Sequence, residues 1–381
     1  MKLTMPQSQQ KPQERRDQFS KIISNMTVVV VDTVAGSRSR ILKALLELGA
    51  KKSSIGIAGN YEHGIAEIKR LKPKLIISDY TLDNKRPGLD LLNIQRSIYP
   101  EHRDCIFLLL TANNSQSAIA QAAEEDVDDF ILKPYTHESL MTSIVEASLR
   151  KIHPSDYMKK IEAGKAALVN GDLKKAMENF DLAKALNPKP SLALFYRGQV
   201  EVVQKSLDQA GDDFKKGLGH SKIHHKCMIG LHESLLKQNR IDDAYAVLKR
   251  LTQYYPANST RLQAVLRMAV KTLNFDDVYD YHPVYKALGD QSDIMIRHLC
   301  SALVVAAKYH LMKKNKARAL QHFNKVVESC QGRASYLRFS VEVLTEFKMY
   351  PEAERVLAQF PATARYGQDY QTLEVLVRNR A

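Results

Sequence analysis

The sequence predicts two parts of different fold class: an α/β domain with a doubly wound five-stranded parallel sheet, then an all-α solenoid of helical repeats. In the first 150 residues, five short apolar segments alternate with amphipathic segments of helical spacing. After Pro154 these strand-like segments stop, and small residues recur every 34 positions. A chain of 381 residues is long enough for two such domains.

The apolar segments of the first part run directly into polar residues, which is typical of parallel strands buried on both faces. The central segment is Leu75-Ile76-Ile77-Ser78, followed by Asp79. We expect strands at 26–31, 54–58, 75–78, 105–110 and 130–132, and helices at 39–48, 61–71, 89–97, 115–124 and 137–151. Residues 1–25 are rich in glutamine and charge, so we expect a disordered tail there.

Four polar residues stand at the carboxyl ends of predicted strands, namely Asp32, Asp79, Thr111 and Lys133. In a doubly wound sheet these ends meet at one edge, where such folds bind ligands. The set is suited to phosphoryl transfer, with Asp79 as nucleophile and Asp32 helping to hold Mg²⁺. The Lys133 ammonium would pair with phosphoryl oxygens, and the Thr111 hydroxyl would bond to an acyl phosphate.

Residues 26–151 resemble the CheY-like receiver domain of bacterial two-component response regulators. The segments that carry the resemblance are Val28-Val29-Val30-Val31-Asp32, Leu75-Ile76-Ile77-Ser78-Asp79, Leu108-Leu109-Leu110-Thr111-Ala112 and Phe130-Ile131-Leu132-Lys133-Pro134. The resemblance implies that Asp79 accepts a phosphoryl group from a sensor histidine kinase. It also implies that Thr111 and Phe130 form a switch pair and that the bond before Pro134 has a trans-to-cis choice.

One position departs from the pattern of this family. Receivers usually carry two adjacent acidic residues after the first strand, but here Asp32 is followed by Thr33. Fewer carboxylates weaken Mg²⁺ binding. Phosphorylation could therefore be slower, could need more Mg²⁺, or could be lost. The nucleophile, threonine and lysine favour a working receiver, and the alternative is a pseudo-receiver in a phosphorylation-independent scaffold.

The second part follows a linker at 152–156, where Pro154 ends the preceding helix. Ala176, Ala210 and Ala244 are 34 residues apart, and an aromatic or leucine follows each after four residues. This register resembles tetratricopeptide repeats (TPR), in which small residues let helices approach closely. We expect about six repeats over 157–365, the fourth irregular with roughly seven extra residues near 281–290, and a capping helix at 366–381.

The resemblance to tetratricopeptide repeats implies a scaffold that binds a peptide or protein partner. By register, Lys165, Gln199 and Glu233 occupy inward positions of the first helices and are poor candidates for a core. We therefore expect these three residues to contact the partner.

Charge leaves a further alternative open. The formal net charge is +14, and residues 151–381 carry +12 of it, which would suit a nucleic-acid-binding regulator. No helix-turn-helix pattern stands out, so nucleic acid ranks behind a protein partner. No apolar run approaches the roughly 18 residues that span a bilayer, and the start of the chain lacks the apolar core of a signal peptide.

The predicted protein is a cytoplasmic response regulator of a phosphorelay. The four cysteines show no metal or redox spacing, which suits a reducing compartment. Phosphorylation at Asp79 would switch the protein–protein interactions of the repeats. No separate enzymatic activity is expected beyond the receiver's own phosphorylation and dephosphorylation, and a homodimer through the last receiver helix remains open.

Overall fold

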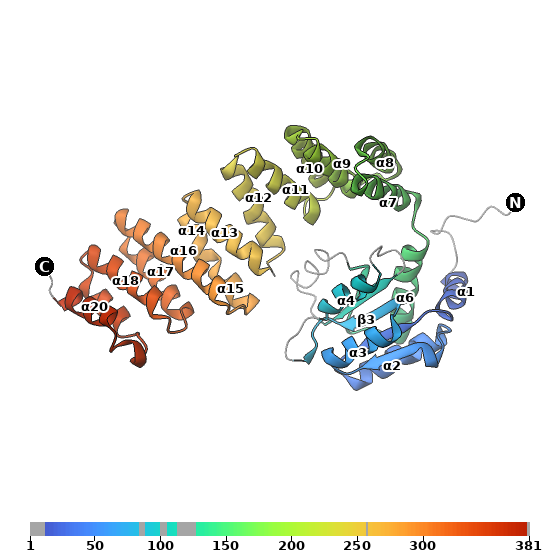
Figure 1. Cartoon of the computed structure of the whole chain (residues 1–381), viewed down its shortest axis with the longest axis horizontal. Helices are drawn as coiled ribbons and strands as arrows, with labels where there is room; N and C mark the ends of the chain where they lie inside the picture. Colours follow the sequence, from blue (N-terminus) through green and yellow to red (C-terminus); the bar gives the residue numbers. More distant parts are fainter. Residues whose placement is uncertain (1–11, 84–87, 100–104, 113–126, 257, 379–381) are drawn as a thin grey trace. The chain divides into compact units, whose positions relative to one another are not determined.

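The computed structural model describes residues 12–83, 88–99, 105–112, 127–256 and 258–378. The chain divides into two compact units, Met1–Cys227 and Met228–Ala381. The first contains a sheet flanked by helices and then helix pairs, and the described part of the second is helical (Figure 1). The predicted fold class, an α/β sheet followed by a helical-repeat solenoid, is confirmed.

One five-stranded sheet forms the centre of the first unit, with the order β2-β1-β3-β4-β5 and parallel pairing throughout. The strands are β1 (Val28–Val31), β2 (Ile55–Ala58), β3 (Leu75–Asp79), β4 (Ile106–Thr111) and β5 (Asp129–Leu132). The chain passes from β1 out to β2 and returns to β3, so the strand order reverses between β1 and β3. The carboxyl ends of strands at such a reversal form the crevice where doubly wound folds bind ligands.

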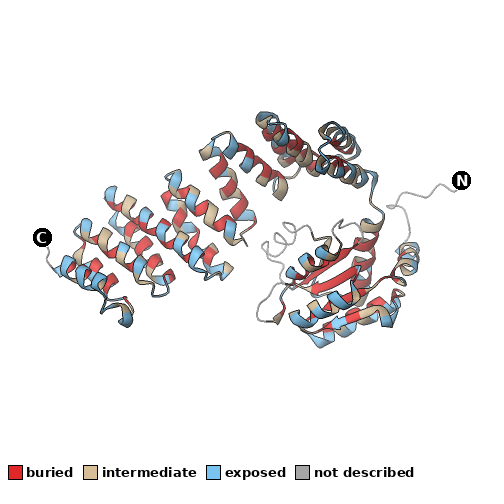
Figure 2. Ribbon diagram, in the orientation of Figure 1, coloured by how far each residue is buried: buried red, intermediate tan, exposed pale blue. Residues whose placement is uncertain are grey.

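Helices cover both faces of the sheet, which is why its strands are almost wholly apolar. Successive residues of a strand point to opposite faces, so Val28 and Val30 join one core while Val29 and Val31 join the other. The strands appear as buried elements between the helices in Figure 2. The first core also contains residues of α2 (Ala35–Glu47) and α6 (His137–Ile152), and the second contains residues of α3 (Tyr61–Leu71) and α4 (Asp90–Ile98). The helix predicted over 115–124 lies outside the described residues.

The prediction of a disordered tail over 1–25 was wrong for the part that the structure describes. Residues Pro12–Ile23 form helix α1. Phe19 and Ile23 lie on one face of it and are 0% exposed in the core beneath α2 and α6. Arg15 pairs with Glu146 of α6 at 2.6 Å. The polar composition concealed two apolar residues four apart, and this spacing is enough to anchor a short helix.

Helix pairs make up the rest of the chain. The first unit contains α7 (Asp156–Val169), α8 (Leu173–Leu186), α9 (Ser191–Val203) and α10 (Leu207–His220). Helix α11 (His225–Lys237) begins at the end of that unit and continues into the second. The second unit continues with α12 (Ile241–Tyr254), α13 (Ser259–Lys271), α14 (Phe275–Asp280), α15 (His282–Leu288), α16 (Asp293–Met312), α17 (Lys316–Ser329), α18 (Ala334–Glu346), α19 (Tyr350–Leu357) and α20 (Gln368–Arg378).

A left-handed backbone residue follows the first helix of each pair and makes the repeat register visible. These residues, with φ between 58° and 78°, are Gly171, Lys205, Asn239, Leu273, Lys314 and Lys348. Successive members are 34 residues apart, except that Lys314 follows Leu273 by 41. A residue in this conformation ends a helix and lets the chain reverse into the next one. The long interval places the seven extra residues between Leu273 and Lys314.

The prediction that these residues lie near 281–290 was wrong. Helices α14 and α15 together occupy 275–288, which is the span of α12 shifted by 34. The helix is broken at Tyr281, but no residues are inserted there, and Pro283 stands in the first turn of α15. The extra residues lengthen α16, which has 20 residues against 13 in α13. His282-Pro283 had indicated the break correctly but not the position of the insertion.

The lengthened α16 is long and apolar enough to cross a membrane by length and composition alone, with a mean hydropathy of 1.2. This differs from the prediction that no apolar run approaches the length needed to span a bilayer. Of this apolar stretch 61% is buried inside the protein, and α16 packs against α13 and α17. Burial of this kind is what the core helix of a helical repeat requires.

Close packing within each pair explains the small residues of the register. A Cβ atom on Gly164 would overlap the ring of Phe180, and a Cβ on Gly198 would overlap the ring of Phe214. In the third pair His232 replaces the glycine, and its Nδ1 lies 2.9 Å from the carbonyl oxygen of Ala244. The first two pairs therefore require glycine where an aromatic ring lies against the first helix.

Candidate functional site

A lysine joins two carboxylates at the carboxyl edge of the sheet. Asp32 follows β1, Asp79 ends β3 and Lys133 follows β5. The Lys133 Nζ atom lies 2.8 Å from Asp32 Oδ2 and 3.1 Å from Asp79 Oδ1. Three of the four predicted residues are thus brought within contact distance by strands that are far apart in the sequence.

Thr111, the fourth predicted residue, ends β4 at the same edge. It is almost fully buried, and its carbonyl oxygen accepts a hydrogen bond of 2.8 Å from the backbone N–H of Lys133. This bond continues the pairing of β4 with β5. The backbone therefore fixes Thr111 and Lys133 beside each other at the edge.

Asp32 is 0% exposed and accepts three hydrogen bonds from the protein. Its Oδ1 accepts from the N–H of Val34 at 2.8 Å, and its Oδ2 accepts from Ser37 Oγ at 2.7 Å and from Lys133. The Ser37 hydroxyl also lies 2.9 Å from the hydroxyl of Tyr135. Ser37 and Tyr135 could not be predicted from the sequence, because neither follows a strand directly and only the fold brings them together.

Asp79 is less buried than Asp32 and has a different environment. Its Oδ1 accepts a hydrogen bond of 3.0 Å from the N–H of Tyr80. Burial raises the pKa of Asp79, the Lys133 ammonium opposes this, and the nearby negative charge of Asp32 adds to it, so the pKa lies above its usual value. A raised pKa marks a carboxylate whose oxygens are unusually basic.

The contacts with Asp32 and Asp79 keep Lys133 protonated. Burial lowers the pKa of Lys133, but its hydrogen bond to Asp32 and the charges of Asp79 and Asp32 outweigh burial and leave the pKa raised. Lys133 is therefore a fixed cation between two carboxylates.

The backbone behind Asp79 is closely packed. The N–H of Gly88 donates to the carbonyl oxygen of Tyr80 at 2.7 Å, and a Cβ on Gly88 would overlap the carbonyl oxygen of Asp79. The next carboxylate, Asp83, points elsewhere, because its Oδ1 accepts a hydrogen bond from the N–H of Tyr61 at the start of α3. Asp79 is thus the acidic residue of this segment that faces Lys133.

The carboxylates of Asp32 and Asp79 fit a Mg²⁺ site with few protein ligands. Within the described residues, no cluster of three or more acidic, histidine or cysteine side chains has metal-site geometry. Mg²⁺ is commonly held by one or two carboxylates together with water and phosphate oxygens, and Asp32 and Asp79 supply two. Thr33 is exposed where a further carboxylate would stand.

The sequence matches the response regulator receiver domain family over residues 28–145. Residues 28–145 form a response regulator receiver domain. The chain is 29% identical over 123 residues to a probable chemotaxis protein CheY of Rhizobium etli, covering 32% of this chain and 92% of that protein. It is 30% identical over 140 residues to the phosphate regulon transcriptional regulatory protein PhoB of Pseudomonas aeruginosa, covering 36% of this chain and 58% of PhoB.

The helical repeats have a distant structural likeness to a tetratricopeptide repeat protein of Parabacteroides merdae. The TM-score is 0.34 and the identity 14%, over 59% of this chain and 86% of that protein.

The predicted switch residues of the receiver domain lie on its last two strands and directly after the last one. Phe130 is in β5, half-buried against the core that α3 and α4 cover. The peptide bond between Lys133 and Pro134 is cis. Phe130 and Thr111 are on adjacent strands, with Thr111 paired to Leu132 in register.

The predicted partner-binding residues are not gathered by the structure into one described site. Lys165 on α7 pairs with Glu162 at 2.9 Å, and its Nζ lies 5.9 Å from the centre of the Tyr196 ring. Gln199 is half-buried on α9, and Glu233 is exposed on α11 in the second unit. Their partner-binding role stays a prediction.

Proposed function

We propose that this chain is a response regulator in which Asp79 accepts a phosphoryl group from a sensor histidine kinase. The observation that supports this most directly is the Lys133 ammonium held between Asp32 and Asp79 at the carboxyl edge of the sheet. A basic carboxylate beside a fixed cation suits attack on phosphorus, because charge then develops on oxygens that the cation can stabilise.

The proposed step is transfer from a phosphohistidine. A carboxylate oxygen of Asp79 attacks phosphorus, a P–O bond forms, the P–N bond to histidine breaks, and the histidine nitrogen keeps the electron pair. Lys133 pairs with the transferred phosphoryl oxygens, and the Thr111 hydroxyl donates a hydrogen bond to one of them. Water attack on the acyl phosphate reverses the modification, and we propose no other enzymatic activity.

Asp32 and Asp79 would hold Mg²⁺ in this site. When bound, the ion neutralises charge on the phosphoryl oxygens. The protein positions Asp32 for this through Val34, Ser37 and Lys133.

The output of the switch is a change in protein–protein interactions. Movement of Thr111 toward the phosphoryl group would let Phe130 turn inward and reshape the face made by α4, β5 and α6. Helix α6 leads into the first repeat, in which Lys165 is a proposed partner contact together with Gln199 and Glu233. We place this activity in the cytoplasm.

Phosphoryl uptake by the purified full-length protein tests the proposal. Acetyl phosphate and Mg²⁺ should add the mass of one phosphoryl group to the wild type and nothing to Asp79→Asn. Asp83→Asn, which changes the next carboxylate along the chain, should still take up one group. Uptake by Asp79→Asn, or none by the wild type at high Mg²⁺, would refute phosphorylation of Asp79.

Two other functions predict different results. A phosphorylation-independent scaffold, motivated by Thr33, predicts that Asp79→Asn leaves partner binding unchanged. A nucleic-acid-binding regulator, motivated by the charge of residues 151–381, predicts affinity for DNA or RNA that falls steeply with salt.

A further inference from the structure

One surface of the second unit combines unpaired positive charge with exposed apolar side chains. Helices α13, α16 and α18 are the first helices of the last three pairs, and α16 packs against both of the others. Each has one exposed stripe and is otherwise largely buried or half-buried. Because neighbouring first helices form one layer, these stripes share a surface, called here the α13–α16–α18 surface.

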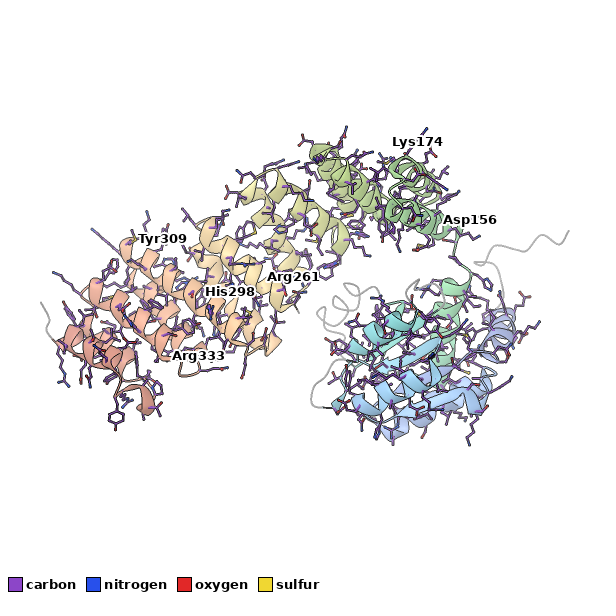
Figure 3. All side chains as sticks on the ribbon, viewed as in Figure 1. Asp156, Lys174, Arg261, His298, Tyr309 and Arg333 are labelled. Carbon is purple, nitrogen blue, oxygen red and sulfur yellow. The ribbon has the colours of Figure 1, made fainter. Side chains whose placement is uncertain are left out.

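The negative charges of these three helices are already paired. Their carboxylates are Asp293, Glu342 and Glu346. Arg333 pairs with Asp293, Arg338 with Glu342 at 2.8 Å, and Lys308 with Glu346 at 2.8 Å. Figure 3 labels Arg333, which stands at the start of α18.

Three exposed cations on the same helices have no such partner among the described residues. They are Arg267 and Lys271 on α13 and Arg297 on α16. Arg267 and Lys271 are four residues apart and therefore lie one turn from each other on one face. Since every carboxylate of these helices is already paired with another cation, the surface has a net positive charge available to a partner.

Large apolar side chains are exposed beside these cations. Ile294 and Val305 on α16 are 58% and 43% exposed, and Phe339 on α18 is 53% exposed. In the described residues of α14, α15, α17 and α19, which are the second helices of the same pairs, no large hydrophobic side chain is exposed to this degree. Exposed apolar groups gathered on one side of a layer are typical of an interaction surface.

We propose that the α13–α16–α18 surface binds an acidic amphipathic segment of a partner protein. Its carboxylates would pair with Arg267, Lys271 and Arg297, and its apolar side chains would cover Ile294, Val305 and Phe339. Nucleic acid would satisfy the cations but would leave the aliphatic side chains uncovered. The inference rests on the proposal that the repeats bind a protein, but it does not depend on phosphorylation of Asp79.

Fluorescence anisotropy on the full chain tests this inference with two synthetic peptides. One is an amphipathic helix of Leu, Ala and Glu, roughly 18 residues or 27 Å long. The other is polyglutamate of the same charge. The wild type should bind the amphipathic peptide more tightly than polyglutamate, and Arg267→Glu/Arg297→Glu should weaken binding about tenfold or more.

Arg355→Glu is the matched control, because Arg355 is an exposed cation on the second helix α19. The substitution Arg355→Glu changes the charge at its site by the same amount as each substitution of the double variant, and this variant should retain its affinity for the amphipathic peptide. Equal thermal unfolding of the variants would show that each folds. The inference fails if the amphipathic peptide does not bind, or if Arg355→Glu weakens peptide binding as much as the double variant does. It also fails if polyglutamate or a DNA duplex binds the wild type as tightly as the amphipathic peptide does. In the absence of a phosphodonor the Asp79→Asn variant should bind the peptide like the wild type, so failure here is distinguishable from failure of phosphoryl transfer.

Discussion

Three of the hydrogen-bonding sites of the Asp32 carboxylate are used by the protein itself. Val34, Ser37 and Lys133 donate to it, whereas a carboxylate offers about four acceptor sites. Little capacity remains for a metal, and Thr33 offers only a hydroxyl where receivers usually have a second carboxylate. The geometry of Asp32 therefore adds to the effect of Thr33 and makes weak Mg²⁺ affinity the expected behaviour.

Thr33→Asp should strengthen metal binding by about tenfold or more, since a carboxylate would be added to a site that has two. Titration with Mn²⁺ followed by electron paramagnetic resonance measures the affinity without any phosphodonor. Thr33→Asn is the control, because asparagine has the shape of aspartate without its charge. Its Mn²⁺ affinity should stay close to that of the wild type. Equal affinities of all three proteins would contradict a role for this position in metal binding.

Asp79→Asn should make the protein more stable at neutral pH. Folding raises the pKa of Asp79 through burial and the charge of Asp32, so folding favours its protonated form over the carboxylate. The destabilisation is absent below the ordinary value of 3.8 and grows as the pH rises through the raised pKa. Thermal melts should show a higher Tm for Asp79→Asn at pH 7, by about 2–4 °C for each kcal/mol removed, and a shrinking difference toward pH 4. A lower Tm at pH 7 would mean that the pairing with Lys133 outweighs burial.

The turns between paired helices depend on residues that tolerate a left-handed backbone. Gly171 meets this requirement without steric cost, whereas Leu273, with φ of 59° and 67% exposure, does not. The left-handed conformation costs a residue with a Cβ about 1–2 kcal/mol. The Leu273 side chain is mostly exposed, so burial offsets little of this cost.

Leu273→Gly should therefore stabilise the second unit by about 0.5–1 kcal/mol, after allowing for the greater flexibility of glycine when unfolded. The reverse change at the equivalent position, Gly171→Ala, should destabilise the first unit by about 1 kcal/mol. Urea unfolding of each variant measures both effects. A destabilised Leu273→Gly would show that the leucine side chain makes a contact worth more than the backbone cost.

His282 gives the broken helix of the fourth pair a pH-dependent stability. It stands where the other pairs have Phe180, Phe214 and Leu248, and its Nε2 lies 2.9 Å from Ser329 Oγ. Burial, with the nearby charge of Lys325, lowers the pKa of His282 from 6.5 to about 4. Its neutral form is favoured by folding, so stability is present above pH 6.5 and is lost as the pH falls from 6.5 to about 4.

His282→Leu should remove this part of the pH dependence. The free energy of unfolding of the wild type should fall on acidification by up to about 3 kcal/mol more than that of the variant. Urea unfolding at pH 7.5 and at pH 4.5 measures the difference. Equal losses in the two proteins would assign the acid sensitivity to other buried histidines.

The amino-terminal helix α1 is part of the core of the first unit. Phe19 and Ile23 are 0% exposed, and Arg16 contacts Glu138 and Thr142 of α6. The helix therefore covers one side of α6. Pairing of two copies through α6, which the resemblance to receivers leaves open, would have to use the remaining side.

Phe19→Ala should cost about 3–5 kcal/mol, as expected for truncating a buried aromatic side chain. Arg16→Ala removes the ion pair with Glu138 and the hydrogen bond to Thr142, both at the surface of the unit, and should cost only about 1 kcal/mol. Guanidinium unfolding followed by circular dichroism distinguishes the two. Similar small losses would show that α1 can detach without opening the core beneath it.

Much of the fold and part of the site could be predicted from the sequence. Apolar runs ending in Asp32, Asp79 and Thr111 identify parallel strands, and the carboxyl ends of such strands must meet. The contacts of Ser37 and Tyr135 could not be predicted, because they depend on how a helix start and a loop approach each other. Helix α1 was missed because composition averages hide two well-spaced apolar residues.

The repeats show a similar limit. The 34-residue register predicted the helix pairs, because close packing at Gly164 and Gly198 requires small residues at fixed intervals. The position of the insertion could not be read from His282-Pro283, since a proline marks a break whether or not residues are added. A lengthened helix produces no break in the apolar pattern when the added residues continue its apolar stripe, so only the shifted register further along the chain records it.

The extra length of α16 limits how such an array can evolve. Seven residues add about 10.5 Å but turn the helix by only about 20° less than two full turns. The stripe that contacts α13 and α17 therefore keeps its direction along the whole helix. Adding five residues instead would turn the later part by about 140° and would bring polar residues into the core. Repeat arrays of this kind should accept changes of length close to whole numbers of turns, such as about seven, eleven or eighteen residues, and related chains should differ at this helix in such steps.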